Sequence, residues 1–89
     1  MSIRAKFRCM EVSKKLTHTT PEGEQVFQYG VRLLPVMLNK KGNYELPAEN
    51  KEFWEATPAG EITLGVMNKT AADRFDAGKC YYVDFTEAP

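Results

Sequence analysis

The sequence predicts a mainly β protein: a small antiparallel β-barrel of the OB-like kind, or a strongly bent sheet. We expect about five strands, with one short helix before the last strand. Apolar and polar residues alternate with period two in several short segments, and turn-forming residues separate these segments. Only one stretch carries start and stop signals for a helix. A chain of 89 residues is long enough for one domain, so residues 1–89 are interpreted as a single β-barrel-like domain.

The first predicted strand covers residues 2–13. Apolar side chains occupy the odd positions from Ile3 to Cys9, and basic side chains occupy positions 4, 6 and 8. This alternation is typical of a strand with one buried face. Near Met10 the apolar residues change from odd to even positions, which predicts a β-bulge or a strand that passes from one side of a barrel to another.

Four further strands are predicted, in three regions of the chain. A polar turn with Pro21 and Gly23 separates the first strand from a second one over residues 25–36. Residues 38–51 are polar and are expected to form a long loop with little regular structure. Residues 52–67 then predict a second hairpin, because Gly60 stands where a three-residue turn needs a left-handed conformation. The last strand covers residues 79–86, where Tyr81 and Tyr82 point to opposite faces.

The predicted helix lies between the second hairpin and the last strand. Thr70 can cap its first turn, Asp73 stands three residues later as in a capping box, and Gly78 ends it. Such a helix would cover the open end of a small sheet or barrel. The predicted core consists of Phe7, Phe27, Val31, Leu33, Ile62, Leu64, Val66, Phe75, Tyr81, Val83 and Phe85.

The two cysteines are predicted to be structural. Cys9 and Cys80 lie far apart, neither belongs to a CxxC pair, and both fall in strand-like segments. Free, buried thiols are the usual state of such residues in a reducing compartment. No segment has the long apolar run of a membrane span or the apolar region of a signal peptide, so we expect an intracellular setting and no membrane partner.

The sequence gives no support for catalysis, a metal or a cofactor. His18 is the one histidine and lies in a polar turn, where a solvated side chain is the ordinary interpretation. The chain has no glycine-rich phosphate loop, no HExxH and no GxSxG. Its glutamates do not have the spacing of a calcium loop. We therefore expect a protein that is not an enzyme, with no catalytic residues, no metal ligands and no cofactor.

Binding to single-stranded nucleic acid is one interpretation of the basic residues. Side chains at alternate positions of a strand stand about 6 to 7 Å apart, near the phosphate repeat of an extended single strand. The candidate contacts to phosphates and bases are Arg4, Lys6, Arg8, Lys14, Lys15, Trp54 and Tyr82, with Lys40, Lys41 and Tyr44 in neighbouring turns. The formal net charge of zero weakens this interpretation, since nucleic-acid binders tend to be basic.

Self-association is the other interpretation. Residues 1–44 carry eight Lys/Arg and three Asp/Glu, whereas residues 45–89 carry four Lys/Arg and nine Asp/Glu. A molecule with opposite charge in its two halves and with edge strands is suited to contact copies of itself. The same asymmetry also fits strands of different charge that fold back together and cancel each other's field.

The second half of the chain resembles small proteins of unknown function from tailed bacteriophages and prophages. The resemblance covers about the last 40 residues and rests on FWEATPAGEITLGVMN and AADRFDAGKCYYVDF. It implies a phage or prophage setting and transfers no catalytic or ligand-binding residue. Phages encode DNA-handling accessories and virion parts in small chains of this kind.

These observations together predict a non-enzymatic, phage-associated binding or assembly protein, with self-association as one expectation. Its partners would be itself or another phage protein, and its location the cytoplasm of a bacterial host or the virion. The alternative is a binder of single-stranded DNA that uses the basic strand face and exposed aromatic residues.

Overall fold

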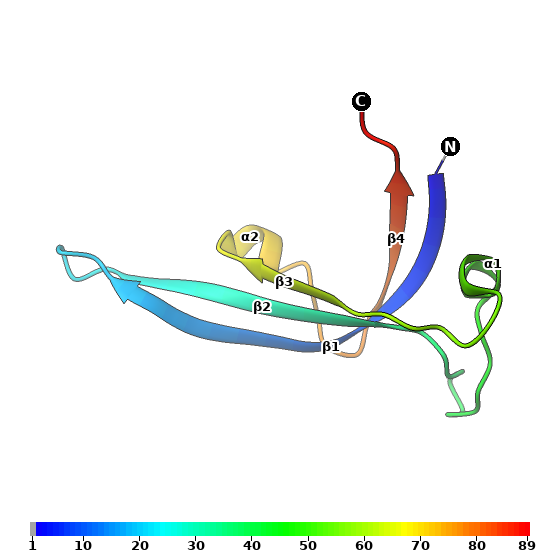
Figure 1. The fold of residues 1–89 in the computed structure, drawn as a ribbon. Helices are drawn as coiled ribbons and strands as arrows, with labels where there is room; N and C mark the ends of the chain where they lie inside the picture. Colours follow the sequence, from blue (N-terminus) through cyan, green and yellow to red (C-terminus); the bar gives the residue numbers. More distant parts are fainter. Residues whose placement is uncertain (1) are drawn as a thin grey trace.

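The computed structural model describes residues 2–89 as one open antiparallel sheet with two short helices (Figure 1). The chain order is β1 (Ser2–Thr19), β2 (Gln25–Pro35), α1 (Ala48–Trp54), β3 (Ile62–Val66), α2 (Lys69–Ala72) and β4 (Cys80–Thr86). The sheet has the strand order β3-β2-β1-β4. The prediction of a mainly β protein is confirmed.

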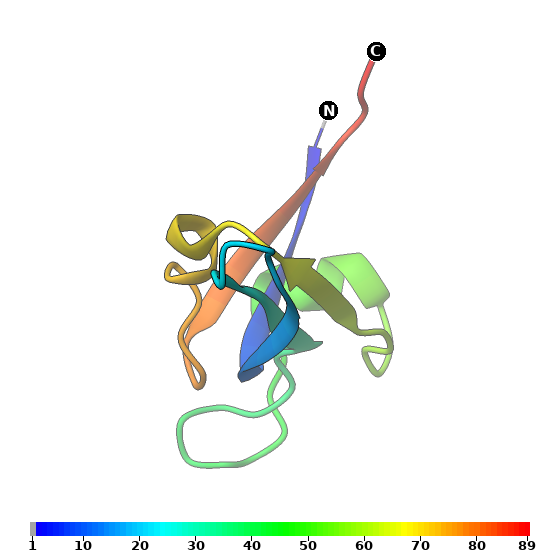
Figure 2. The ribbon, with the colours of Figure 1, turned by 90° about the vertical axis from the view of Figure 1, so that its left-hand side faces the viewer.

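The predicted barrel and the fifth strand are wrong. β3 and β4 stand at opposite edges of the four-stranded sheet and do not pair, so the sheet stays open. Figure 2 shows how far the sheet twists, with β4 running in a different direction from β3. The fifth strand is missing because residues 52–54 belong to α1, so the predicted hairpin over residues 52–67 retains only its second half, as β3.

A long β1–β2 hairpin dominates the shape. It is paired from Thr19 and Gln25 down to Phe7 and Pro35, but β3 reaches only the segment from Tyr29 to Leu33. β4 pairs only with the first part of β1, up to position 8. Residues 15–28 therefore form a two-stranded arm whose edges pair with no other strand of residues 2–89, and it projects from the rest of the molecule (Figure 1).

The change of apolar parity near Met10 correctly predicts a bulge. The register of β1 against β2 shifts between Cys9 and Glu11, and β1 bends at this point (Figure 1). Before the bulge the odd-numbered residues face the core, and after it Val12 stands opposite the buried Val31. The extra residue keeps the apolar side chains on one face while the strand changes direction.

The core lies on one face of the sheet. Ala5, Phe7, Cys9, Val31 and Leu33 are buried together, and the side chains partly buried against them are Phe53, Trp54, Ile62, Phe75, Tyr81 and Val83. The prediction that Leu64 and Phe85 belong to the core is wrong, because 38% and 47% of their surface is exposed. An open sheet has no second layer over its ends, so residues with the correct alternation remain uncovered there. Cys9 is buried as expected, whereas Cys80 is exposed, and both are free thiols.

Helix α1 lies where the sequence predicted a loop followed by a strand. Pro47 precedes its first residue, Glu49 lies in its first turn, and Glu55 ends it in a left-handed conformation with φ of 59°. The predicted helix after residue 70 is shorter than expected. α2 has four residues, and Asn68, in place of Thr70, caps it by accepting a hydrogen bond from the amide of Ala71.

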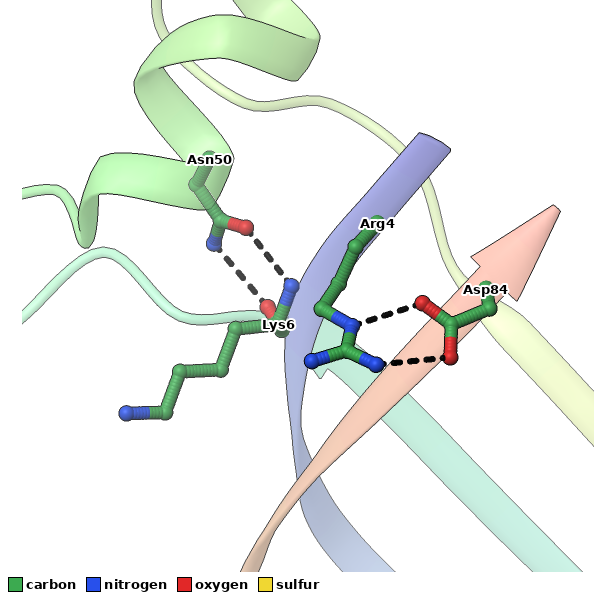
Figure 3. A network of polar contacts seen from close by, with 4 residues as sticks. All are labelled: Arg4, Lys6, Asn50 and Asp84. Carbon is green, nitrogen blue, oxygen red and sulfur yellow. Dashed lines mark hydrogen bonds and ion pairs between the residues drawn. The ribbon is translucent and has the colours of Figure 1, made fainter. Parts of the chain in front are cut away.

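Asn50 holds α1 against the edge of β1. Its side chain is fully buried, and its Oδ1 accepts from the Lys6 amide at 2.7 Å (Figure 3). Its Nδ2 donates to the carbonyl oxygens of Lys6 at 2.9 Å and Val36 at 3.0 Å. β2 ends at Pro35, so this carboxamide takes the place of the next ladder partner and satisfies the backbone of β1.

Candidate binding surfaces

The predicted basic face of β1 exists, but one of its three cations is already paired. Arg4, Lys6 and Arg8 alternate with buried residues along β1. The Arg4 guanidinium donates to both carboxylate oxygens of Asp84 on β4, with Nε–Oδ1 at 2.7 Å and Nη2–Oδ2 at 3.1 Å (Figure 3). The two residues face each other in the β1–β4 register. Arg4 therefore has less free charge to offer an external anion than the sequence suggested.

The Arg4–Asp84 pair shifts the ionisation of both groups. The hydrogen bonds and charge of Arg4 lower the pKa of Asp84, and Asp84 in turn raises the pKa of Arg4. We expect a carbon-detected NMR titration to place the Asp84 midpoint below that of an ordinary aspartate, and Arg4→Gln to move it upward. The pair contributes to stability above the ordinary aspartate pKa, and this contribution is lost as the pH falls through the lowered value.

An unshifted Asp84 midpoint in the unmodified protein would contradict the pairing. Glu61 is the matched control, because its pKa is lowered by Arg32 instead, with Nε–Oε2 at 3.0 Å, and should not respond to Arg4→Gln.

Tyr82 lies beneath the basic side chains, where a platform for base stacking is expected. Arg4 and Lys6, however, already contact the face of its ring. The Arg4 Cζ is 4.7 Å and the Lys6 Nζ is 5.9 Å from the ring centroid. Glu49 of α1, on the other side of β1, is also close to the Tyr82 hydroxyl. Its pKa is lowered by its own backbone amide and by the Tyr82 hydroxyl. Tyr82 is 54% exposed, so part of the ring remains accessible.

The other predicted contacts lie elsewhere. Trp54 packs against Phe7, with ring centroids 5.9 Å apart, on the opposite face of β1 from Lys6. Its Nε1 donates to the carbonyl oxygen of Ala59 at 3.0 Å. Lys14 places its Nζ 4.1 Å from the centroid of Phe27, near the base of the arm, and Lys15 lies on the arm itself. The structure does not bring these residues together with the basic face.

A cationic hollow is the main feature of the basic face. It has a volume of about 380 Å³ and lies between β1, the loop after β2 and the start of α1. Lys6, Arg8, Lys40 and Lys51 line it, against one carboxylate, that of Glu45. The Arg8 Nε is shielded from solvent and has no hydrogen-bond partner among the described residues. An anion in the hollow would meet an excess of positive charge.

Sequence reasoning identified part of this hollow. Lys6, Arg8 and Lys40 were among the basic residues expected near one another, whereas Lys51 was not singled out. Lys51 lines the hollow because Asn50 holds α1 beside β1 and Lys51 is the next residue of that helix. In the sequence, a buried asparagine within a polar segment looks the same as an exposed one. This contact therefore could not be predicted.

A second, apolar hollow of about 750 Å³ lies on the opposite face of the sheet. Residues of both sheet edges line it, with Ile62 and Leu64 from β3 and Tyr81 and Val83 from β4. Phe75, which follows α2, forms part of the wall and packs against Tyr81 with ring centroids 5.3 Å apart. The Tyr81 hydroxyl donates to the Arg74 carbonyl and accepts from the Asp76 amide, which fixes this wall. The hollow is the uncovered inner face of the curved sheet.

Within residues 2–89 the structure contains no group of three His, Cys, Asp or Glu side chains that could hold a metal ion. His18 lies near the tip of the arm, with its Nδ1 3.1 Å from the Thr17 hydroxyl. In the same residues no helix has the length and apolar character needed to cross a membrane. Comparison with protein-family models, curated proteins and solved structures gives no match.

Proposed function

We propose that this protein is a non-enzymatic assembly protein that associates with copies of itself, in a phage or prophage setting. The supporting observation is its excess of exposed surface. The chain exposes 6680 Å², whereas a compact monomer of 10.1 kDa exposes about 5300 Å². A standard protein–protein interface removes about 800 Å² from each partner. The excess is therefore large enough for a complete interface.

The overall dimensions support the same proposal. The Cα radius of gyration is 16.2 Å, against about 12 Å for a compact chain of this length. The two-stranded arm accounts for part of this difference, and an isolated two-stranded hairpin is at best marginally stable in water. A chain that extends in this way gains stability when another chain covers it.

Within the described residues, five of the ten exposed large apolar side chains lie on the core side of the sheet. This uncovered apolar face consists of Ile3, Val12, Leu16, Leu64 and Phe85, each more than a third exposed. Isolated exposed apolar residues are normal, but a set on one face that continues a core is typical of an interface. Burial of this face in an oligomer would stabilise it by about 25 cal/mol for each Å² of apolar surface.

Light scattering coupled to size exclusion tests the proposal, with protein loaded from about 1 to about 200 µM. We expect the mass to rise from that of the 10.1 kDa chain to twice that value or more. Because the face is apolar, the association should persist when the salt concentration is raised. A mass of one chain throughout the range would overturn the proposal.

Single-stranded nucleic acid is a second candidate ligand, and the cationic hollow is the observation that favours it. Four basic side chains line the hollow, and the Nζ of one of them, Lys6, is 5.9 Å from the centroid of the half-exposed Tyr82 ring. This combination offers charge to phosphates and a partly accessible aromatic face to a base. The hollow moves the expected contact away from Arg4 and the arm and toward Lys40 and Lys51.

Fluorescence anisotropy with a labelled single-stranded oligonucleotide, at about 50 and about 200 mM salt, tests this candidate. We expect the double variant Lys40→Ala/Lys51→Ala to weaken binding and to reduce the salt slope by about one to two units. The matched control, Lys14→Ala/Lys15→Ala, removes the same charge from β1 near and on the arm and should bind as the unmodified protein does. Equal losses in both variants would contradict a site in the hollow. Absence of binding at low salt would exclude this function.

A further inference from the structure

The outer edge of β4 is open and unprotected. β4 is an edge strand of seven residues, CYYVDFT, without Lys, Arg, Pro or Gly. Native proteins usually protect such edges with these residues, with a bulge or with a covering element. The one charged residue, Asp84, is held by Arg4 of the same chain. β4 therefore has the character of a strand that pairs with a further strand.

The backbone hydrogen bonds of β1 show which groups of β4 face outward. The amide and carbonyl of Lys6 point toward α1 and β2, because Asn50 and Val36 bind them. Lys6 stands opposite Tyr82 in the β1–β4 register. The N–H and C=O of Tyr82 consequently point away from β1, and the alternation of a strand extends this to Cys80, Asp84 and Thr86. Within the described part of the chain, no group binds the backbone donors and acceptors of these four residues on that side.

We propose that a second copy of the chain docks on this edge, with the two β4 strands antiparallel and a two-fold axis at Val83. This inference rests on the proposed self-association and names its surface. Tyr82 would then exchange hydrogen bonds with Asp84 of the second copy, and Cys80 with Thr86. The two symmetry-related sets give about eight inter-chain hydrogen bonds. The result is a continuous sheet made of the two four-stranded sheets.

The residue pattern of β4 selects both the partner and the register. With the axis at Val83 all seven residues overlap, and Tyr81 stands opposite Phe85 of the second copy on the apolar face. Aromatic cross-strand pairs of this kind stabilise sheets. An axis at Asp84 would place two carboxylates opposite each other, and an axis at Tyr82 would leave both strand ends unpaired. The segment YYVDF is thus complementary to itself, as an isologous interface requires.

The second edge of the sheet fits this role less well. β3 has five residues, and Gly65 in its interior has no side chain to pack. Pairing through β4 also joins the uncovered apolar faces of both copies, because Phe85 and Val83 lie on that face beside the apolar hollow. Phe85, which packs against Phe53 at 5.7 Å between ring centroids, would be covered by Tyr81 of the second copy.

The first test removes one outward hydrogen-bond donor. Tyr82→Pro eliminates the amide that faces the second copy but no backbone hydrogen bond within the chain, and edge positions of this kind tolerate proline. Tyr82→Ala is the matched control, since it removes the same ring and keeps the amide. We expect Tyr82→Pro to raise the dimer dissociation constant at least tenfold over Tyr82→Ala in sedimentation or light scattering. Circular dichroism checks that both variants fold.

The second test uses the exposed Cys80 and does not depend on a proline. In the proposed register Cys80 faces residue 86 of the second copy, with Cα atoms about 5.5 Å apart, which suits a disulfide. Thr86→Cys should therefore form covalent dimers with oxidised glutathione, which takes up the two electrons of the thiol pair. Glu87→Cys points to the other face, and in the unmodified protein the two Cys80 residues are about 20 Å apart. Neither should cross-link rapidly.

The outcomes separate this inference from the broader proposal. If the unmodified protein dimerises, but Tyr82→Pro matches Tyr82→Ala and Thr86→Cys cross-links no faster than Glu87→Cys, the β4 interface is overturned while self-association stands. If the unmodified protein is monomeric at all concentrations, both are overturned. If Tyr82→Pro does not fold, the cross-linking comparison decides.

Discussion

Asn50→Asp should destabilise the protein by about 4 kcal/mol at neutral pH, a large part of the stability of a domain of this size. The substitution replaces the Nδ2 donor by an oxygen that faces the carbonyls of Lys6 and Val36. It also places a carboxylate at a fully buried position. Urea denaturation at a fixed protein concentration, followed by circular dichroism, measures the loss.

The loss from Asn50→Asp should depend on pH in a defined direction. Burial and the facing carbonyls raise the pKa of the new carboxyl in the folded state above its unfolded value of about 4. Below that value both states hold the proton, and the neutral acid can donate one of the missing hydrogen bonds. As the pH rises toward the raised pKa, the unfolded state releases its proton first, so stability is lost. The variant should be closer to the unmodified protein at pH 4 than at pH 7.

Asn43→Asp is the matched control, because Asn43 is exposed in the loop before α1. This change should alter the free energy of unfolding by less than about 0.5 kcal/mol at either pH. Equal effects at positions 43 and 50 would contradict the role of Asn50 as a substitute for a strand partner.

Phe7→Ala should cost about 3 to 4 kcal/mol. Phe7 is 5% exposed and contacts Trp54 of α1, so its removal leaves a cavity between the sheet and this helix. Phe27→Ala is the matched control on the arm, where the ring is only partly buried and its neighbour is Lys14. The control should cost about 1 kcal/mol. Thermal and urea unfolding would measure both, and a larger loss at Phe27 would contradict the placement of the core.

The strands that carry a clear alternation were predictable from the sequence. Period two located most of β1, β2 and β4, and the parity change at Met10 located the bulge. These features depend on local rules about which side of a strand a residue faces. The same rules could not decide whether the sheet closes, because closure depends on which distant strands pair.

Helix α1 was missed for a physical reason. Adjacent Phe53 and Trp54 suggested a strand with one ring on each side, but in a short helix packed at a sheet edge both rings reach the same core. The available signal was Pro47 followed by Glu49, an arrangement typical of a helix start. The turn-forming residues around it outweighed that signal.

The candidate surfaces were only partly predictable. Alternation placed Lys6 and Arg8 on one face correctly, yet it could not show that Arg4 meets Asp84, a residue 80 positions away. That contact requires the register between the first and last strands. Tyr82 was correctly expected on the face opposite Tyr81, although its ring carries cations and is not fully free.

β1 should resist local opening more strongly at its beginning than at its end, because its end belongs to the two-stranded arm. Near Phe7 the backbone has a strand on one side and a strand end and a helix on the other, whereas beyond Lys15 it has one neighbour and no helix. Amide protons at the two ends of β1 should therefore exchange with solvent through different events. Exchange near Phe7 requires unfolding of the whole sheet, while exchange near Thr17 requires only that the hairpin tip separates. We therefore expect one continuous strand to contain both slowly and rapidly exchanging amides.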